Sequence, residues 1–259
     1  TARQAKGNSI ANLLTLREGE EVTAIIPVES FEAPEHYLVM LTHKGIMKKT
    51  NLSAFSNIRR HGLIALHLDE DDRLGWVKLT NGSQNLLVST QLGMAIHFNE
   101  GNIRAMGRSA RGVIAIRLRP KDRVVAMDIT HPDAEILTIT NNGYGKRTPI
   151  SEYKIQNRAG TGLINIKLRR DGKVASILTV HGSEEIIVVT SNGIVIRQRV
   201  DKIPSYSRST KGVVVQKLDQ GDRIVAVGLV LAEETSETTE EMVEIIDLSQ
   251  EQQNTALDN

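Results

Sequence analysis

The sequence predicts an all-β protein, a propeller-like radial array of four-stranded units of about 50 residues each. Two observations predict it. Glycines recur at a fixed period, at Gly62, Gly112, Gly162 and Gly212, and each opens a similar stretch, such as GLIALHL or GVIAIRL. No segment of the sequence shows a long helical period. Because a single sheet cannot bury both of its faces, such units must pack against one another to enclose a core.

The four strands of one unit are expected at 113–118, 123–129, 135–140 and 144–148, separated by the turn-rich segments RPKD, HPDA and NNG. A second set of glycines follows a threonine by three residues, at Gly45, Gly93, Gly143 and Gly193. Asn and Gly before these strands favour tight hairpins, because both tolerate positive φ. Only 3% of the residues are aromatic, so the core between units is expected to be aliphatic.

The repeats divide residues 1–230 into units near 1–57, 58–107, 108–157, 158–207 and a partial unit at 208–230. GNSIANLLTL, which begins at Gly7, is a longer first copy of the repeated stretch. Residues 231–259 form an acidic tail. Two interpretations of the tail stay open: a disordered, solvated terminus, or an apolar run, MVEIIDL, that adds an edge strand to the incomplete last unit.

Charge is divided unevenly along the chain. The tail holds nine acidic residues and no Lys or Arg, whereas residues 1–230 hold all 32 basic residues and 22 acidic ones, a net charge of +10. This asymmetry predicts a body that binds a polyanion. The absence of cysteine excludes disulfides, thiolate catalysis and cysteine-bound zinc. No apolar run is long enough for a membrane helix and no signal peptide begins the sequence, so we expect a cytoplasmic protein without a membrane partner.

Basic residues recur in phase with the repeated glycines. Arg stands four positions before the first glycine in four of five copies, and Lys or Arg stands directly before it in three. Further basic residues follow the second glycine by three or four positions. A radial fold would place these positions around one rim. The candidate DNA-binding residues are Arg3, Lys6, Lys48, Lys49, Arg59, Arg60, Arg104, Arg108, Arg111, Lys146, Arg147, Arg158, Arg169, Arg170, Arg197, Arg199, Arg208 and Lys211.

A curved basic belt suits double-stranded DNA, whose closely spaced phosphates bind Lys and Arg with little discrimination of sequence. Proteins that bind single strands instead stack bases on aromatic side chains, and here no aromatic residue occupies a repeated position. Two alternatives stay open: these charges only solvate surface turns, or the rim binds an acidic protein partner or the chain's own tail.

Catalytic and metal sites are not predicted. The seven histidines show no ligand spacing and occupy different phases of the repeat. GYGKRT lacks the first glycine of a phosphate-binding loop, since Thr140 stands in its place. The acidic run 69–72 lacks the calcium-loop spacing and is interpreted as a turn. No nucleophile and base can be paired, which leaves a hydrolase a remote alternative, and no cofactor or metal is expected.

Four segments carry a family resemblance: AKGNSIANLL, GIMKKTNLSAF, IRAMGRSARGVIAIRL and NNGYGKRTPISEYKIQNRAGTG. Over residues 1–230 the chain resembles the C-terminal domain of bacterial DNA gyrase A. The similar C-terminal domain of topoisomerase IV, whose repeats are more degenerate, is the second choice. The resemblance implies a β-pinwheel, a disc whose blades exchange strands and around whose basic rim DNA bends, so that strand passage favours negative supercoils.

The resemblance also implies binding partners, and the sequence departs from the family in one motif. The partners are double-stranded DNA, the rest of DNA gyrase A and, through it, the gyrase B protein of an ATP-dependent topoisomerase, while the isolated fragment is expected to be monomeric and non-catalytic. The family's heptad, a Gln-Arg-Arg-Gly-Gly-Lys-Gly-like gyrase box, has no full match here. The nearest stretch keeps Gln156, Arg158, Gly160 and Gly162 and is interpreted as a degenerate copy. The domain is therefore expected to bend DNA without completing a wrap.

Overall fold

The computed structural model describes residues 16, 19–58, 62–169 and 171–230. Five of the candidate basic residues (Arg3, Lys6, Arg59, Arg60 and Arg170) lie outside the described residues, and so does the acidic tail with its expected edge strand. The chain divides into two compact units, Thr1–Leu229 and Val230–Asn259. Apart from Val230, every described residue belongs to the first unit.

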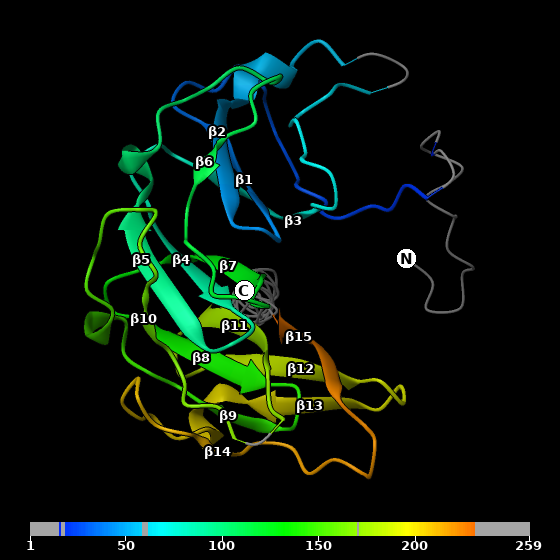
Figure 1. The fold of residues 1–259 in the computed structure, drawn as a ribbon, viewed down its shortest axis with the longest axis vertical. Coiled ribbons are helices and arrows are strands. Elements are labelled where there is room, and N and C mark those ends of the chain that lie inside the picture. The colour runs from blue at the N-terminus through cyan, green and yellow to red at the C-terminus, as the bar shows by residue number, and fades with distance from the viewer. Residues whose placement is uncertain (1–15, 17–18, 59–61, 170, 231–259) are drawn as a thin grey trace, which may run out of the picture. The chain divides into compact units, whose positions relative to one another are not determined.

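The described residues form four antiparallel sheets that follow one another along the chain (Figure 1). Sheet 1 has the strand order β3-β1-β2-β6, sheet 2 has β10-β5-β4-β7, sheet 3 has β11-β8-β9-β14, and sheet 4, as far as it is described, has β13-β12-β15. The strands are β1 Tyr37–Thr42, β2 Ile46–Asn51, β3 Leu74–Thr80, β4 Asn85–Thr90, β5 Met94–Asn99, β6 Val113–Ile114, β7 Val124–Thr130, β8 Glu135–Thr140, β9 Tyr144–Lys146, β10 Leu163–Ile164, β11 Val174–Val180, β12 Glu185–Thr190, β13 Val195–Arg199, β14 Val213–Val214 and β15 Ile224–Val230. Short 3-10 turns follow four of them: η2 Leu52–Phe55, η3 Glu100–Asn102, η4 Ile150–Glu152 and η5 Val200–Lys202.

Neighbouring sheets exchange strands. The four strands expected in the unit from 113 to 148 are all present, as β6, β7, β8 and β9, but they belong to three different sheets. The β6 strand pairs with β2 of sheet 1, and β10 and β14 pair in the same way with β5 and β9. The sequence period is therefore correct, while one sequence unit is not one sheet.

Each hairpin turn is closed by the repeated threonine and glycine. In the turn between β4 and β5, the Thr90 hydroxyl oxygen accepts a hydrogen bond from the Met94 N–H at 3.3 Å. Gly93 there has φ +81° and its N–H donates to the Thr90 carbonyl at 3.1 Å. Asp122 binds the same turn, because its carboxylate accepts from the Thr90 hydroxyl at 2.7 Å and from the Leu92 N–H at 2.9 Å. The expected turn at 69–72 has the same design, since Asp72 accepts from the Lys44 N–H.

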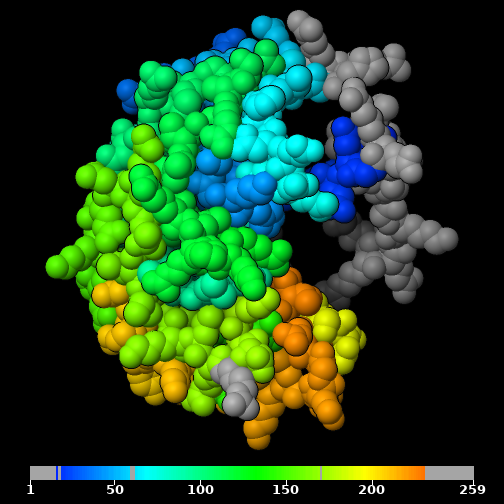
Figure 2. Space-filling view, in the orientation of Figure 1, coloured from blue at the N-terminus to red at the C-terminus, as the bar shows by residue number. Residues whose placement is uncertain are grey.

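The core lies between neighbouring sheets. One buried cluster joins Val39 and Met47 of sheet 1 to Leu86 and Phe98 of sheet 2. Two further clusters join sheet 2 to sheet 3 and sheet 3 to sheet 4, and nearly all of their members are aliphatic. In the space-filling view, atoms of successive segments touch without a break from green through yellow to orange (Figure 2). The expectation of an aliphatic core between units is confirmed.

Candidate nucleic-acid interface

Three loops of the described chain carry the basic residues that recur four positions before the glycines. We call them the return loops: residues 103–112, 153–162 and 203–212. Each leaves a 3-10 turn of one sheet and returns to add the outer strand of the preceding sheet. Parallel bridges fix where each loop begins, and they join Lys49 to Ala105, His97 to Ile155 and Arg147 to Ser205. Equivalent loops therefore lie at equivalent edges of successive sheets.

The glycine that ends each return loop is required by close packing. Gly162 has φ +74°, and a Cβ atom on it would lie 2.4 Å from the Ala95 carbonyl oxygen. Gly112 and Gly212 meet the Met47 and Gly145 carbonyl oxygens in the same way, at 2.6 and 2.5 Å. The repeated glycine thus lets the loop approach the preceding sheet before the outer strand begins.

The arginines of the return loops are anchored at the surface. An Nη1 of Arg158 donates to the Ile114 carbonyl at 3.1 Å, and Arg208 donates to the Ile164 carbonyl at 2.9 Å, one repeat further on. Both bonds are exposed. A guanidinium group has five N–H donors, so either arginine can bind a phosphate while it holds its carbonyl. Arg108 is half-buried at the same position of the first loop.

Other candidates on or near the loops are exposed, but several have partners. Arg104 and Lys211 are exposed. Arg111 forms a two-point ion pair with Asp69, and this contact lowers the pKa of the Asp69 carboxyl. Exposed pairs of this kind contribute little to stability and can be replaced by a phosphate.

Three more candidates have local partners. Arg197 pairs with Glu185 and Arg199 with Asp201. The Arg169 guanidinium carbon lies 4.4 Å from the centre of the Tyr144 ring. Both ion pairs are exposed, so these arginines also stay accessible.

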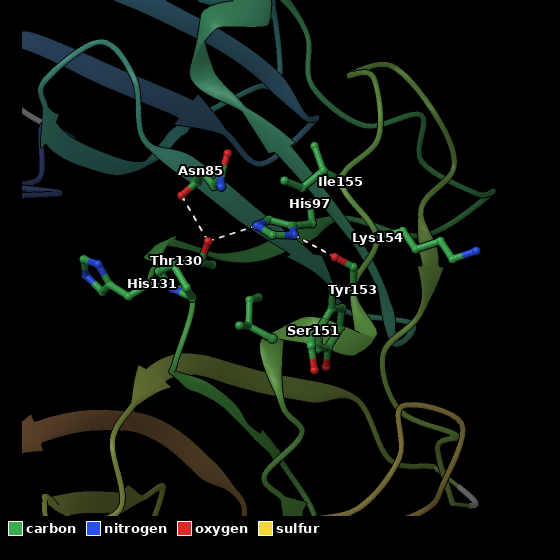
Figure 3. Close-up of a pocket in the computed structure, with 10 residues that line it drawn as sticks. Asn85, His97, Thr130, His131, Ser151, Tyr153, Lys154 and Ile155 are labelled. Atoms are coloured by element: carbon green, nitrogen blue, oxygen red, sulfur yellow. Dashed lines mark hydrogen bonds between the residues drawn. The ribbon is translucent and has the colours of Figure 1, made fainter.

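Sequence reasoning missed a further set of exposed basic residues, which follow each outer strand: Arg117, Lys167 and Lys217. Main-chain bonds place two of them against a return loop, since the Arg117 N–H donates to the Gly160 carbonyl and the Lys167 N–H to the Thr210 carbonyl. The signal was present, because all three recur at a period of 50. Lys154, which is also exposed, takes the position of Arg104 in the second loop, and its side chain extends away from His97 in Figure 3.

The structure corrects the expectation for Lys48, Lys49 and Lys146. All three are buried, with 0%, 6% and 0% of their surface exposed, so they do not lie on a basic rim. The Lys49 ammonium donates to the Glu100 carbonyl at 2.9 Å and lies 3.7 Å from the Glu100 carboxylate. All three cations bind main-chain carbonyls of segments further along the chain.

The position of Lys49 also joins neighbouring sheets at the next two junctions, where His97 and Arg147 occupy it. The Arg147 Nε donates to the Ile203 carbonyl at 2.5 Å, and its guanidinium pairs with Glu135. Arg147 is therefore largely enclosed by protein partners and is a weaker candidate for a phosphate contact. At the junction between sheets 2 and 3, the position is His97, whose Nδ1 lies 2.8 Å from the Tyr153 carbonyl and whose Nε2 lies 2.9 Å from the Thr130 hydroxyl (Figure 3).

Burial changes the ionisation of these groups. Desolvation lowers the pKa of Lys146 to about 8, with Glu152 opposing the shift and Arg208 adding to it. The pKa of Lys48 is also lowered, first by burial and then by Arg108. Burial likewise lowers the pKa of His97, although its bond to the Tyr153 carbonyl opposes this. The shift favours the neutral form of the His97 imidazole. His97 also lines a pocket of about 340 Å³.

The residues that resemble a degenerate box lie together in the second return loop. The Gln156 N–H donates to the His97 carbonyl at 2.8 Å. Gly160 packs over Ile96, since a Cβ atom on it would lie 3.5 Å from the Ile96 Cδ1. Gln156, Arg158, Gly160 and Gly162 thus share one loop at one sheet edge, and their part in DNA binding stays a prediction.

The described residues hold neither a metal centre nor a membrane-spanning helix. No group of three or more His, Cys, Asp or Glu among them could hold a metal ion. No helix in this part of the chain is long and apolar enough to cross a membrane.

The arrangement defines a class of protein: a β-pinwheel of strand-exchanging sheets with basic loops repeated along one edge. The chain belongs to the family of the DNA gyrase C-terminal domain, beta-propeller, whose model matches residues 1–29, 36–81, 84–131, 134–181 and 184–230.

Curated relatives agree with this family. The DNA gyrase A protein of Halalkalibacterium halodurans is 50% identical over 108 residues, which are 42% of this chain and 13% of that protein. The DNA gyrase A protein of Synechocystis is 43% identical over 112 residues, again 42% of this chain and 13% of that protein. The matched segment thus spans about an eighth of the length of these relatives.

Solved structures share the fold. A crystal structure of the C-terminal domain of DNA topoisomerase IV has a TM-score of 0.83 at 26% identity, covering 92% of this chain and 75% of that one. A structure of the DNA gyrase A C-terminal domain has a TM-score of 0.77 at 23% identity, covering 88% and 76%.

Proposed function

We propose that this domain binds and bends double-stranded DNA along the edge formed by its return loops, without catalysing a reaction itself. In the complete protein it would act as part of DNA gyrase A and support negative supercoiling. Membership of the gyrase C-terminal domain family supports this proposal.

One observation carries the proposal: the return loops repeat an anchored arginine at the same edge of successive sheets. Arg158 and Arg208 make the same bond to the outer strand one repeat apart. Arg117 and Lys167 lie beside the same two loops. A surface charge that only solvates a turn needs no fixed geometry from one sheet to the next.

Binding of phosphates along this edge would bend the DNA because the contacts lie on successive sheets. Each contact releases condensed counterions, which favours binding without reading the sequence. Because the contacts come from separate sheets, a duplex must follow the edge from one sheet to the next to reach them all. The elastic cost of bending is offset by the additional contacts that the bend permits.

The partners and setting follow from this assignment. The rest of DNA gyrase A would deliver the bent duplex to strand passage, and the gyrase B protein would supply ATP hydrolysis. In this proposal the chain acts in the cytoplasm, where the DNA is. No cofactor is proposed for the domain itself.

The test compares two triple variants of equal charge. Arg117→Gln, Lys167→Gln and Lys217→Gln together remove three exposed charges that follow the outer strands. We expect the slope of log Kd against log salt for a linear duplex to fall by about 0.9 for each phosphate that is no longer bound. The measurement is fluorescence anisotropy over a salt range of about 50 to 200 mM, with bending followed by energy transfer between the duplex ends.

The control is Arg73→Gln, Arg123→Gln and Arg223→Gln. These residues are exposed and recur in phase, but each directly precedes a strand at the opposite edge of its sheet. The control should keep the wild-type slope. Equal losses in the two triple variants would contradict a DNA path along the return loops, and binding that does not respond to salt would contradict the electrostatic mechanism.

A second candidate is the corresponding domain of topoisomerase IV. The TM-score of 0.83 to a topoisomerase IV C-terminal domain favours it. Curated relatives named as DNA gyrase, at 40–50% identity, favour the first candidate. The catalytic region of the complete protein separates the two, because its sequence differs between the two enzymes.

A further inference from the structure

Two buried lysines lie beneath the return loops and are not themselves part of the exposed basic surface. Lys48 on β2 and Lys146 on β9 occupy equivalent positions, three residues after the glycine of their hairpin turn. Both side chains are fully buried. Within the described residues, neither forms an ion pair with a carboxylate. A buried ammonium group without such a pair is costly unless its protons are bound elsewhere.

Main-chain carbonyls of the return loops bind these protons. The Lys146 Nζ donates to the Ser207 carbonyl at 2.6 Å and to the Arg208 carbonyl at 2.8 Å. The Lys48 Nζ donates to the Arg108 carbonyl and, at 2.6 Å, to the Ala65 carbonyl. Each lysine therefore holds the main chain of the arginine that recurs four positions before the glycine.

The second junction lacks the lysine and uses main-chain bonds instead. The equivalent residue is Ile96, which packs beneath Gly160. There the Ala159 N–H donates to the Ala115 carbonyl at 2.7 Å. Ala115 is the counterpart of Ala65, whose carbonyl accepts from Lys48. A loop amide of the second loop thus binds the carbonyl that an ammonium group binds in the first.

We propose that Lys48 and Lys146 are positioning residues for DNA binding, which fix Arg108 and Arg208 in the direction that phosphate contact requires. The inference rests on the proposed function. At Arg208 both main-chain groups are bound, the carbonyl by Lys146 and the N–H by Glu152 at 2.9 Å. This fixes the peptide planes on either side of Arg208 and so the direction in which its side chain leaves the loop. An arginine held in this way loses less conformational entropy when it binds phosphate.

The test is a double-mutant cycle on DNA affinity in the full chain. Lys146→Met keeps an unbranched side chain of similar length but removes the donors, and Arg208→Gln removes the guanidinium. If Lys146 acts through Arg208, the double variant should bind a linear duplex no more weakly than the weaker single variant. We expect each single change to weaken binding several-fold and to lower the salt slope by about 0.9 for each phosphate released.

The matched control pairs Lys146→Met with Arg158→Gln, because Arg158 lies at the same position of the loop that has no lysine beneath it. These two changes should be additive. Hydrogen exchange gives a second readout: the Thr210 N–H, which donates to the Ser207 carbonyl at 3.2 Å, should exchange faster in Lys146→Met.

Each outcome decides the inference. Additive losses in both pairings mean that Lys146 contributes only charge or stability, and they overturn it. A normal affinity in Lys146→Met also overturns it. If Lys146→Met does not fold by circular dichroism, the same cycle with Lys48→Met and Arg108→Gln gives the decision. If the wild-type chain binds no duplex at low salt, the proposed function fails with the inference, whereas a failure of the inference alone leaves wild-type binding intact.

Discussion

The outer junctions and the middle junction use different chemistry at the same two positions. Between sheets 1 and 2 these positions are Lys48 and Lys49, and between sheets 3 and 4 they are Lys146 and Arg147. Between sheets 2 and 3 they are Ile96 and His97, which are uncharged. The parallel bridge to the following loop is nevertheless present at all three junctions of the described chain.

The difference shows that these positions need a group that binds a carbonyl, and that a positive charge is one way to supply it. The neutral imidazole of His97 lies against the Tyr153 carbonyl much as the Arg147 guanidinium binds the Ile203 carbonyl. Basic residues that recur in phase therefore have two causes in this fold. One is the joining of sheets, and the other is the exposed edge proposed to bind DNA.

The three junctions share the glycine that ends each return loop. We expect this glycine to matter more for stability than the residues in which the junctions differ. Gly162→Ala would force a Cβ atom to 2.4 Å from the Ala95 carbonyl oxygen, in a residue with positive φ. Because neither backbone can move away, we expect a loss of about 3 kcal/mol in the free energy of unfolding. Urea denaturation measures it.

The control for this prediction is Gly62→Ala, because Gly62 has the same φ of +74° and none of the described residues lies within 4 Å of its Cβ position. That change should cost only about 1 kcal/mol, the strain of a left-handed alanine. Equal losses in the two variants would mean that backbone conformation alone, and not close packing, requires the repeated glycine.

A smaller effect on stability is expected at alkaline pH, at the junction between sheets 3 and 4. The pKa of Lys146 is about 8 in the folded protein, below its ordinary value of 10.5. Between these values the unfolded chain binds the proton that the folded protein has lost, so the free energy of unfolding should rise with pH across this range. We expect urea midpoints of the wild type, relative to Lys146→Met, to increase from about pH 8 to pH 10.5. A constant difference would show that Lys146 is not desolvated.

The smallest effect concerns the middle junction at acid pH. Burial lowers the pKa of His97 below its ordinary value, so its contribution to stability is present above that value and is lost as the pH falls through it. The wild type should therefore lose stability between about pH 7 and pH 5 more steeply than His97→Gln does. Parallel pH profiles of the two proteins would show that His97 titrates as freely when folded as when unfolded.

The repeat predicted most of the fold, because turn chemistry is local. The threonine and glycine of each hairpin turn are both visible in the sequence and both act in the turn. The exchange of β6, β10 and β14 was not visible from the residues themselves, since a fixed period does not say where a unit begins. Pairing between distant segments decides that, and here the family resemblance alone implied it.

The candidate site was predicted in part. Arg158 and Arg208 were found through their phase, and the structure anchors both at the surface. Lys48 and Lys49 were misplaced, although adjacent residues of a strand point to opposite faces and so could not share one rim. Burial depends on the segments that pack above a strand, and nothing in IMKKTN shows that a loop 60 residues later covers Lys48.

Strand exchange also sets an order of events during synthesis. Sheet 1 begins at Tyr37 but receives its last strand only when Ile114 has been made. At roughly 5–20 residues per second, β2 therefore presents an unpaired edge for several seconds on a nascent chain. Lysine on an edge strand discourages pairing with another molecule. Lys48 lies on β2 and Lys146 on β9, two of the strands whose edges stay unpaired until the outer strand has been made. The third such strand, β5, has Ile96 at the same position and no lysine there.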